Sequence, residues 1–358
     1  MLRRVASAVH GAVEPKALRA EGGDPAAVID FSSNQSPLGA APAVAAAVAT
    51  AVVDAYPDRC AGALCEAIAR VVDVPSPSVV AGNGSTELIR LIAQLALAPW
   101  QHAVALGPSF GEYEVATLLC GAQFHEVRPT HFGSGSGFCH DEAMLARILA
   151  GELVRLCWIC SPNNPTGGVI APGRLVRLVH DHPRTLFVLD EAYCDLLDEP
   201  QWTQGSLAAG NLIVLRSLTK SWGLAGLRLG YCLAEESTAA ALRAAAPPWS
   251  VNACAQSAGL AALADTDHHE RSLALLRSER DRLMTALQRR GWATEPTWAG
   301  FFLVRVTDAT EVRMKLLRRG FLVRDCSSFG LPEYVRLSPR LPSQNDALLA
   351  AWDEAATP

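Results

Sequence analysis

The sequence predicts an α/β protein that combines a mainly parallel sheet in a large domain with a smaller α+β domain. Short apolar β-like runs alternate with amphipathic helical stretches through the middle of the chain, which is typical of a parallel sheet covered by helices on both faces. After residues 247–252 (PPWSVN) the order changes, because two long helical stretches precede two more β-like runs. The chain has 358 residues, 50% of them hydrophobic, which is enough for both domains.

The predicted elements follow one another in chain order. The β-like runs of the first part cover residues 102–107, 154–160, 185–193, 211–218 and 227–234. The helical stretches among them include 85–98 and 173–182. The last part has predicted helices at 253–265 and 270–291 and predicted strands at 301–306 and 334–338. Because ligands of parallel sheets collect at the C-terminal ends of the strands, the residues directly after each run are candidate site residues.

Composition and charge exclude several classes of protein. The net charge is −5 with both signs interspersed, so the chain has no basic field for nucleic acid or for an anionic membrane. No segment approaches the ~20 apolar residues of a membrane helix or has the form of a signal peptide, which predicts a cytoplasmic protein. The stretches 180–182 and 265–270 contain metal-ligand residue types without ligand spacing, so they are expected to be solvated and no metal site is predicted.

Two features with redox or phosphate-binding character have simpler explanations. Cys157 and Cys160 have the spacing of a redox motif, but they lie in an apolar run, so reduced thiols in a buried strand are expected. The glycine-rich stretch 132–138 is not followed by a helix, which predicts a loop rather than a phosphate-binding turn.

The first candidate strand end is AGNGSTELI (81–89), a glycine turn that opens an apolar-periodic helix. Asn83 or Ser85 would cap this helix. The free amides of Gly84, Ser85 and Thr86 would then form a phosphate site at the positive end of the helix dipole. An ordinary capped helix is the alternative interpretation.

Two further strand ends carry polar side chains. In SPNNPTGG (161–168) the prolines and glycines predict a tight turn that holds the amide of Asn164 over the sheet edge, with an ordinary loop as the alternative. In LFVLDEAY (186–193) Asp190 follows four apolar residues, so its carboxylate would be buried and would need a cation or several hydrogen bonds. Tyr193 would point into the same cleft. A nucleotide-triphosphate site is disfavoured, because the chain has no GxxxxGK[ST] motif.

The fourth strand end is LRSLTKSWGLAGLRLG (215–230), in which small, hydroxylated or apolar residues surround Lys220. A lysine in such a pocket has a lowered pKa, and a neutral amine condenses with a carbonyl group. One ligand satisfies all four strand ends: pyridoxal 5′-phosphate, which has an aldehyde, a pyridine nitrogen and a phosphate. The sequence therefore predicts a pyridoxal-phosphate site without a metal ion.

Each candidate residue has a predicted role toward this cofactor. Lys220 would bond to the aldehyde carbon, and Asp190 would pair with the protonated ring nitrogen. Phe110, in GPSFGEY, would stack on the ring, and Asn164 and Tyr193 would hydrogen-bond the ring oxygen. The phosphate would be bound by Gly84, Ser85, Thr86, Ser217, Thr219 and Arg228, of which Arg228 supplies the charge.

The motifs GNGST, PSFGEY, SPNNPTGG, DEAY, SLTK and GLRLGY, in this order, resemble the fold-type I pyridoxal-phosphate enzymes of aminotransferase class I/II. The stretches DFSSNQSPLG, YPDR, RSLTK, PPWSVN and VRDCSSFGLPEYVRLS resemble most closely those of histidinol-phosphate aminotransferase and threonine-phosphate decarboxylase. The resemblance implies a seven-stranded, mainly parallel sheet in a large cofactor-binding domain at 41–240. It also implies a segment at 1–40 that packs at the active site and a small domain at 241–358.

The resemblance further implies residues on the substrate side. Arg336 matches an arginine that clamps the substrate carboxylate, and Arg324 matches a second arginine near the distal end of the substrate. Asn34 matches a residue that lines the substrate entrance. Tyr56 matches a tyrosine that reaches the cofactor phosphate of the neighbouring subunit, which implies a homodimer. From the residues alone, an exposed strand position is the alternative for each arginine.

Three positions depart from the relatives, all on the substrate side. Ser36 stands where the family usually has a second asparagine, and Gly300 also takes a position usually held by asparagine. Residues 10–12 read HGA where the decarboxylase often has HGG.

The predicted activity is transamination of a small amino acid or amino-phosphate substrate, with a keto acid as the second substrate. Lys220 would remove the Cα proton of the substrate and return it as a general acid. Decarboxylation of an amino-acid phosphate such as threonine phosphate remains open, because it needs the same cofactor pocket and differs only in how Arg324 and Arg336 orient the substrate. A ligand-sensing regulator built on the same domain is a third possibility, which the presence of both Lys220 and Asp190 disfavours.

Overall fold

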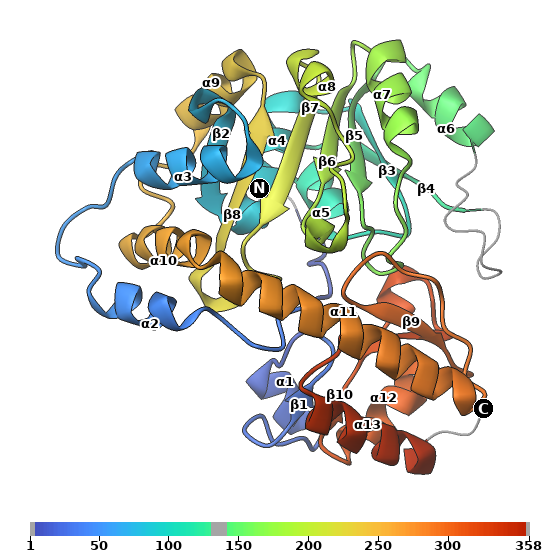
Figure 1. The fold of residues 1–358 in the computed structure, drawn as a ribbon. Coiled ribbons are helices and arrows are strands. Elements are labelled where there is room, and N and C mark those ends of the chain that lie inside the picture. The colour runs from blue at the N-terminus through green and yellow to red at the C-terminus, as the bar shows by residue number, and fades with distance from the viewer. Residues whose placement is uncertain (1–3, 130–141, 356–358) are drawn as a thin grey trace.

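The computed structural model describes residues 4–129 and 142–355, with a seven-stranded sheet at the centre (Figure 1). The strands are β2 (Val79–Asn83), β3 (His102–Leu106), β4 (Gln123–Val127), β5 (Val154–Cys160), β6 (Leu186–Asp190), β7 (Leu212–Ser217) and β8 (Leu229–Ala234). Their spatial order is β2-β8-β7-β6-β5-β3-β4. Strand β8 is antiparallel to both of its neighbours, and the other neighbouring pairs are parallel. The predicted mainly parallel sheet is confirmed.

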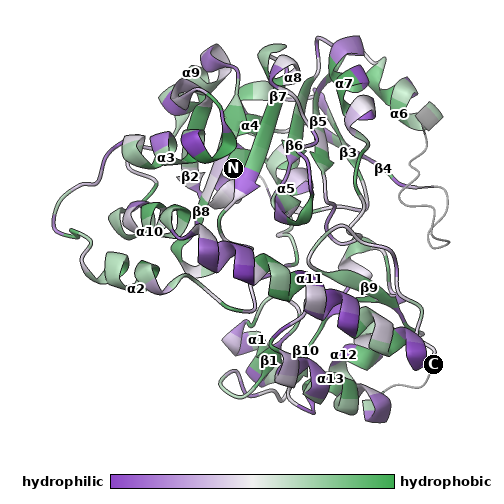
Figure 2. Ribbon diagram, viewed as in Figure 1, coloured by the Kyte–Doolittle hydropathy of each residue, from purple (hydrophilic) through white to green (hydrophobic). Residues whose placement is uncertain are grey.

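Helices cover both faces of this sheet, because successive side chains of a strand point to opposite faces. In β5, Cys157 and Ile159 pack into one core, and Leu156 and Trp158 pack into the other. The first core is covered by α2 (Pro42–Ala49), α3 (Gly62–Val72), α6 (Glu142–Leu149), α7 (Pro172–Asp181), α8 (Gln204–Ala208) and α10 (Ala253–Ala264). The second core is covered by α4 (Gly84–Ala96), α5 (Glu112–Leu119) and α9 (Glu236–Ala245). The central strands are accordingly hydrophobic (Figure 2).

A second, smaller layer contains the C-terminal part of the chain and its N-terminal segment (Figure 1). Strands β9 (Phe302–Arg305), β11 (Arg324–Asp325) and β12 (Tyr334–Leu337) form an antiparallel sheet in the order β11-β12-β9. It shares a core with α11 (Thr266–Arg289), α12 (Ala309–Leu317) and α13 (Pro342–Ala355). The N-terminal segment, with α1 (Pro15–Ala20), joins this layer because β1 (Ile29–Asp30) pairs with β10 (Phe321–Leu322).

Short 3₁₀ helices complete the described structure at Ser76–Ser78, Cys194–Leu196, Ala225–Leu227 and Ser327–Phe329. None of the described helices combines the length and the apolar character that a membrane crossing requires. The division of the chain at residues 40 and 240 stays a prediction.

Most predicted elements are present, and the differences have physical reasons. The predicted strand at 185–193 ends at Asp190, because the chain leaves the sheet there and soon turns into a 3₁₀ helix. Strands β2 and β4 were not predicted, since β2 ends in the glycine turn and β4 is a largely polar edge strand. Cys157 and Cys160 are free thiols in β5, as expected. The stretch 132–138 lies outside the described residues.

The prediction that residues 265–270 are solvated is wrong for His269. Asp265 caps α11 through its side chain, which accepts a hydrogen bond from the His268 amide, so these residues form the helix start. The His269 ring stacks on Trp222, with ring centroids 3.6 Å apart. In the part of the chain that the structure describes, no group of three or more ligand residues is placed to hold a metal ion.

Gly223 lets the N-terminal segment pack on the loop after β7. Its φ is +72°, and a Cβ atom there would overlap the carbonyl group of Gly39. Gly210 has a similar φ of +81° but open space around it. We expect Gly210→Ala to lower the free energy of unfolding by about 1 kcal/mol through backbone strain alone. Gly223→Ala should lower it by about 2–4 kcal/mol, because overpacking adds to the strain.

Urea unfolding of the two variants beside the wild type measures this difference. Equal losses for the two variants would contradict the close packing of the N-terminal segment on Gly223.

Candidate active site

Lys220 lies in the loop directly after β7. It lines a cleft between the large sheet with its helices and the smaller layer. Its ammonium nitrogen is 5.7 Å from the ring centroid of Tyr193. Burial in the cleft, together with the positive charges of Arg336 and Arg228, lowers the pKa of Lys220 to about 8. A substantial fraction of this amine is therefore neutral, and hence nucleophilic, near neutral pH.

Asp190 ends β6 and is 3% exposed. Its Oδ2 accepts a hydrogen bond of 2.7 Å from Tyr113 Oη, and its Oδ1 accepts one of 3.0 Å from the Ala192 amide. Burial raises the pKa of Asp190, and these hydrogen bonds and the nearby Lys220 oppose the rise. The strand end thus holds a carboxylate whose ionised form is stabilised by donors and by a cation.

Tyr113 is a site residue that the sequence analysis missed. It lies on α5, three residues after Phe110, and its ring stacks parallel on Trp158 with centroids 5.2 Å apart. Burial and the charge of Asp190 raise the pKa of Tyr113 well above its ordinary value. The phenol therefore stays protonated and donates a hydrogen bond to Asp190.

The predicted phosphate residues come together where α4 begins. Gly84 opens α4, and a Cβ atom there would lie 2.9 Å from an Arg228 guanidinium nitrogen. Ser217 Oγ and Thr219 Oγ1 are 2.7 Å apart, and both residues are buried. The predicted side-chain cap is wrong for Asn83, whose side chain makes no capping bond.

Strand pairing explains why these residues meet. Ser217 at the end of β7 pairs with Gly230 of β8, and a Cβ atom on Gly230 would lie 2.6 Å from the amide nitrogen of Ser85. The start of α4, which includes Thr86, therefore packs directly on the ends of two central strands.

Asn163 is a second residue that the sequence analysis missed. Its side chain accepts a hydrogen bond of 2.7 Å from Ser109 Oγ and donates bonds of 2.9 Å to Pro108 O and to Thr166 Oγ1. These bonds join the loop at 161–168 to the loop that carries Phe110, which is half-buried. No sequence signal distinguished it from the adjacent Asn164, because both follow the same strand.

Arg324 and Arg336 are paired residues of β11 and β12. Arg336 donates to Asn164 Oδ1 and, over 2.6 Å, to Ser32 O. Arg324 donates over 2.9 Å to Val9 O and over 2.6 Å to Ser328 Oγ. Both arginines are buried, so the alternative of an exposed strand position is wrong for both.

In the described chain, carboxylates act on these two arginines only from beyond salt-bridge distance, Asp325 on Arg324 and Asp30 on Arg336. Within residues 4–129 and 142–355, no salt bridge involves either side chain, and the Nε of each has no hydrogen-bond partner. Burial and the charge of Arg336 lower the pKa of Arg324 to about 10, and burial lowers the pKa of Arg336. Arg324 lines a cavity of about 520 Å³, which is the size of a small-molecule site.

Asn34 and Gly300 line the cleft beside Tyr193 and Lys220. The Oδ1 of Asn34 is buried without a partner among the described residues. A Cβ atom on Gly300 would lie 2.6 Å from Leu276 Cδ2, so this glycine lets α11 approach the cleft.

Ser36, another departure from the relatives, has a local structural consequence. Ser36 Oγ forms a 2.5 Å hydrogen bond with Ser272 Oγ of α11. Tyr56, a further predicted site residue, lies on the surface: it is 80% exposed and stacks on Trp249, with ring centroids 4.5 Å apart.

Comparison with known proteins identifies the family. The model of the family described as aminotransferase class I and II matches residues 26–351. The chain belongs to this family. The predicted family and fold class are confirmed, and the protein is an aminotransferase that depends on pyridoxal 5′-phosphate.

Relatives and solved structures agree with this family. The aminotransferase is 40% identical to a histidinol-phosphate aminotransferase of Symbiobacterium thermophilum, over 91% of each chain. It is 35% identical to histidinol-phosphate aminotransferase 2 of Ralstonia nicotianae, over 99% of this chain and 96% of the relative.

Two solved structures are also similar. The histidinol-phosphate aminotransferase of Sinorhizobium meliloti, in complex with pyridoxal-5′-phosphate, has a TM-score of 0.87 at 25% identity. The match covers 96% of this chain and 94% of that structure's chain. The L-threonine-O-3-phosphate decarboxylase of Porphyromonas gingivalis has a TM-score of 0.76 at 28% identity and covers 90% of this chain and 98% of its own.

The cleft of this aminotransferase fits the cofactor chemically. Lys220 offers an amine with a lowered pKa, and Asp190 offers a buried carboxylate for a ring nitrogen. The start of α4, with Arg228 beside it, offers amide donors and a charge for a phosphate. Pyridoxal phosphate supplies an aldehyde and a ring that accepts electrons.

The lowered pKa of Lys220 predicts a pH dependence for cofactor capture by the apoprotein. Only the neutral amine attacks an aldehyde, and its fraction rises ~tenfold per pH unit below the pKa and levels off above it. With a pKa of about 8, the capture rate should rise between pH 6 and 8 and be flat above about pH 9.

Stopped-flow absorbance after mixing apoprotein with pyridoxal phosphate measures this rate. A rate that still rises steeply between pH 9 and 10 would mean that the lysine has its ordinary pKa. The Lys220→Ala variant is the control, because it binds the cofactor without a covalent bond.

Proposed function

We propose that this aminotransferase acts on a small amino substrate that carries a phosphate, of the histidinol-phosphate type, with a keto acid as the second substrate. The observation that carries the proposal is the buried pair Arg324 and Arg336, whose two charges have no carboxylate partner in the described chain. A dianionic phosphate suits two guanidinium groups better than a single carboxylate does, because it offers more acceptor oxygens and charge. The relatives named as histidinol-phosphate aminotransferases support this substrate class.

Toward the cofactor, we assign the roles that the cleft supports. Lys220 would bond to the aldehyde, Asp190 would pair with the protonated ring nitrogen, and Phe110 would cover the ring. Asn164 and Tyr193 donate to the ring oxygen. The phosphate is bound by Gly84, Ser85, Thr86, Ser217, Thr219 and Arg228.

Lys220 also moves the proton in the proposed reaction. With the cofactor in place, the Nζ atom of Lys220 would serve as the base at the substrate Cα. Because its pKa is lowered to about 8, this amine can take the proton from the substrate Cα near neutral pH. Arg324 and Arg336 hold the far end of the substrate, and Asn34 lines its entrance, so that this proton faces Nζ.

Decarboxylation is the second candidate activity. The threonine-phosphate decarboxylase structure is 28% identical to this chain, and the Sinorhizobium structure is 25% identical. This similarity supports decarboxylation as the alternative. The two reactions need the same lysine and carboxylate and differ in which bond of the substrate is broken.

The proposal includes a homodimer in the cytoplasm. Tyr56 and Trp249 form an exposed aromatic pair away from the cleft of their own subunit. Exposed stacked aromatics are typical of protein interfaces. In the dimer, Tyr56 would reach the cofactor phosphate of the other subunit. We also propose that the chain consists of an N-terminal segment at 1–40, a large domain at 41–240 and a small domain at 241–358.

A single-turnover reaction without keto acid tests the activity and the substrate. Holoenzyme is mixed separately with histidinol phosphate, threonine phosphate and histidinol, and the released cofactor is weighed by mass spectrometry. We expect pyridoxamine phosphate from histidinol phosphate and a rate about 10²-fold lower from histidinol, because the arginine pair is then unpaired. The Arg324→Gln variant should lose most of this preference for the phosphate.

The other outcomes of this experiment are also decisive. Carbon dioxide from threonine phosphate, with unchanged pyridoxal phosphate, would replace transamination by decarboxylation. Equal rates with histidinol and histidinol phosphate would contradict the role of the arginine pair.

Hybrid dimers test the role of Tyr56. Lys220→Ala and Tyr56→Ala should each be nearly inactive. Mixing the unfolded chains and refolding them should restore about a quarter of the wild-type activity, because half of the dimers then contain one complete site. Activity that stays at the level of the two parents would show that Tyr56 serves its own subunit or none.

A further inference from the structure

Arg340 lies three residues after β12, and its guanidinium group binds the N-terminal segment at residues 30–35. Its Nε donates to Asp30 O, and its Nη1 donates over 3.2 Å to Gln35 O. Its Nη2 donates over 2.5 Å to Ser33 O and over 3.1 Å to Ser33 Oγ. The four acceptors belong to three residues of one segment. The guanidinium therefore closes a loop of chain around itself.

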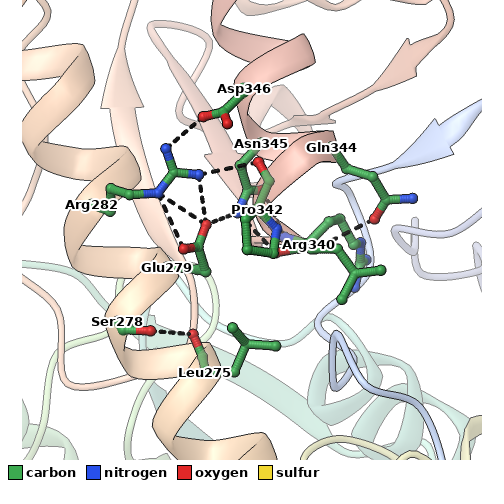
Figure 3. Close-up of polar contacts among 10 residues, drawn as sticks. Leu275, Ser278, Glu279, Arg282, Arg340, Pro342, Gln344, Asn345 and Asp346 are labelled. Atoms are coloured by element: carbon green, nitrogen blue, oxygen red, sulfur yellow. Dashed lines mark hydrogen bonds and ion pairs between the residues drawn. The ribbon is translucent and has the colours of Figure 1, made fainter.

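The backbone of Arg340 is in turn fixed by α13 and α11 (Figure 3). Asn345 of α13 is fully buried, and its Oδ1 accepts a 2.8 Å hydrogen bond from the Arg340 amide. Its Nδ2 donates over 2.8 Å to Arg340 O and over 2.6 Å to Glu279 Oε2 of α11. Arg340 is thus a connection between the helices of the smaller layer and the N-terminal segment.

The segment that Arg340 holds forms one wall of the cleft. Asn34 lines the cleft beside Tyr193 and Lys220, and the Ser36 amide donates over 3.1 Å to Lys220 O. Ser32 O accepts from Arg336. Regular structure covers only the two residues of β1 here, so most backbone groups of the segment need partners from elsewhere.

The side-chain carboxylate of Asp30 organises the segment internally. The Oδ1 of Asp30 accepts hydrogen bonds from the amide and the hydroxyl of Ser32, at 2.7 and 2.6 Å, and its Oδ2 accepts from the hydroxyl of Ser33 at 2.5 Å. These bonds form a compact turn. The N-terminal segment is attached to the smaller layer by β1, by Arg336 and by Arg340.

We propose that Arg340 is a positioning residue for the substrate entrance: it holds residues 30–36 so that Asn34 and Arg336 keep their places in the cleft. The inference rests on the proposed function, because the role of Asn34 toward the substrate belongs to that proposal. The cofactor residues lie on β6, β7, α4 and the loops beside the central strands, and the hydrogen bonds of the Arg340 guanidinium go to residues 30–35 instead. Loss of Arg340 should therefore weaken substrate binding and leave the cofactor in place.

The geometry calls for arginine rather than lysine. The acceptors lie around three different nitrogens of a planar group, which a forked guanidinium reaches together. A lysine has its three donors on one atom and would satisfy only part of the set. Arg340→Lys should therefore be intermediate between the wild type and Arg340→Met.

The test uses the holoenzyme of Arg340→Met and Arg340→Lys, with Arg282→Met as the matched control. Arg282 belongs to the same network, where it donates to Glu279, Asp346 and Pro342 O, but it lies at the end away from Arg340 (Figure 3). Three quantities are measured: amide hydrogen exchange of residues 30–36, the absorbance of the bound cofactor, and KM and kcat with histidinol phosphate.

For Arg340→Met we expect amides 30–36 to exchange about tenfold faster, with unchanged cofactor absorbance. We expect kcat/KM to fall by about 10- to 100-fold, mainly through a higher KM. Arg282→Met should lower the melting temperature while leaving exchange at 30–36 and KM as in the wild type.

Three results would overturn the inference. The first is wild-type exchange and KM in folded Arg340→Met. The second is faster exchange with unchanged KM, and the third is the same changes in Arg282→Met. If Arg340→Met does not fold, Arg340→Lys decides by the same criteria. If even the wild type does not react with any phosphate substrate, the proposed function fails, while the exchange data still decide whether Arg340 holds the segment.

Discussion

The burial of positive charge in one cleft is the constraint on which the rest of the structure depends. Lys220 lines this cleft, Arg336 and Arg228 act on its charge from nearby, and Asp190 is the carboxylate that acts on it with the opposite sign. Burial and, after it, the like charges of the two arginines disfavour the protonated amine, so Lys220 has a lowered pKa. Backbone carbonyls, such as Ser32 O, stabilise the arginines without neutralising them. The cleft is therefore prepared for anionic ligands.

The two halves of this cleft are built in different ways. Asp190 and Lys220 follow neighbouring parallel strands, and Tyr113 approaches Asp190 from a helix that stacks on the same sheet. Side chains on such elements have little freedom, which suits a cofactor that must stay in register through every turnover. The residues proposed to bind the substrate lie on short strands and on an N-terminal segment that is attached by arginine side chains. Differences in substrate among related enzymes would accordingly concentrate there, since such segments change without disturbing the sheet.

Much of the cofactor site could be predicted because its signals are local. The apolar run at 154–160 is a strand with these same bounds, Asp190 is the last residue of its strand, and Lys220 follows its strand by three residues. Tyr113 and Asn163 could not be assigned, because each acts on a residue far away in the chain: Tyr113 on Asp190, and Asn163 on Ser109. Strand β4 was not predicted, because a polar edge strand lacks the hydrophobic pattern of a buried strand.

The sequence by itself determined the class of fold, the cofactor and the residues that follow each strand, because periodicity, turn residues and motif order are properties of neighbouring residues. Only the tertiary structure decided that Arg324 and Arg336 are buried without carboxylates, that Tyr56 points away from its own cleft, and that Arg340 holds the wall beside Asn34. Some of these contacts join segments more than 300 residues apart, such as Arg340 with Ser33 at a separation of 307. Such pairs meet through the packing of whole layers, which a local pattern does not record.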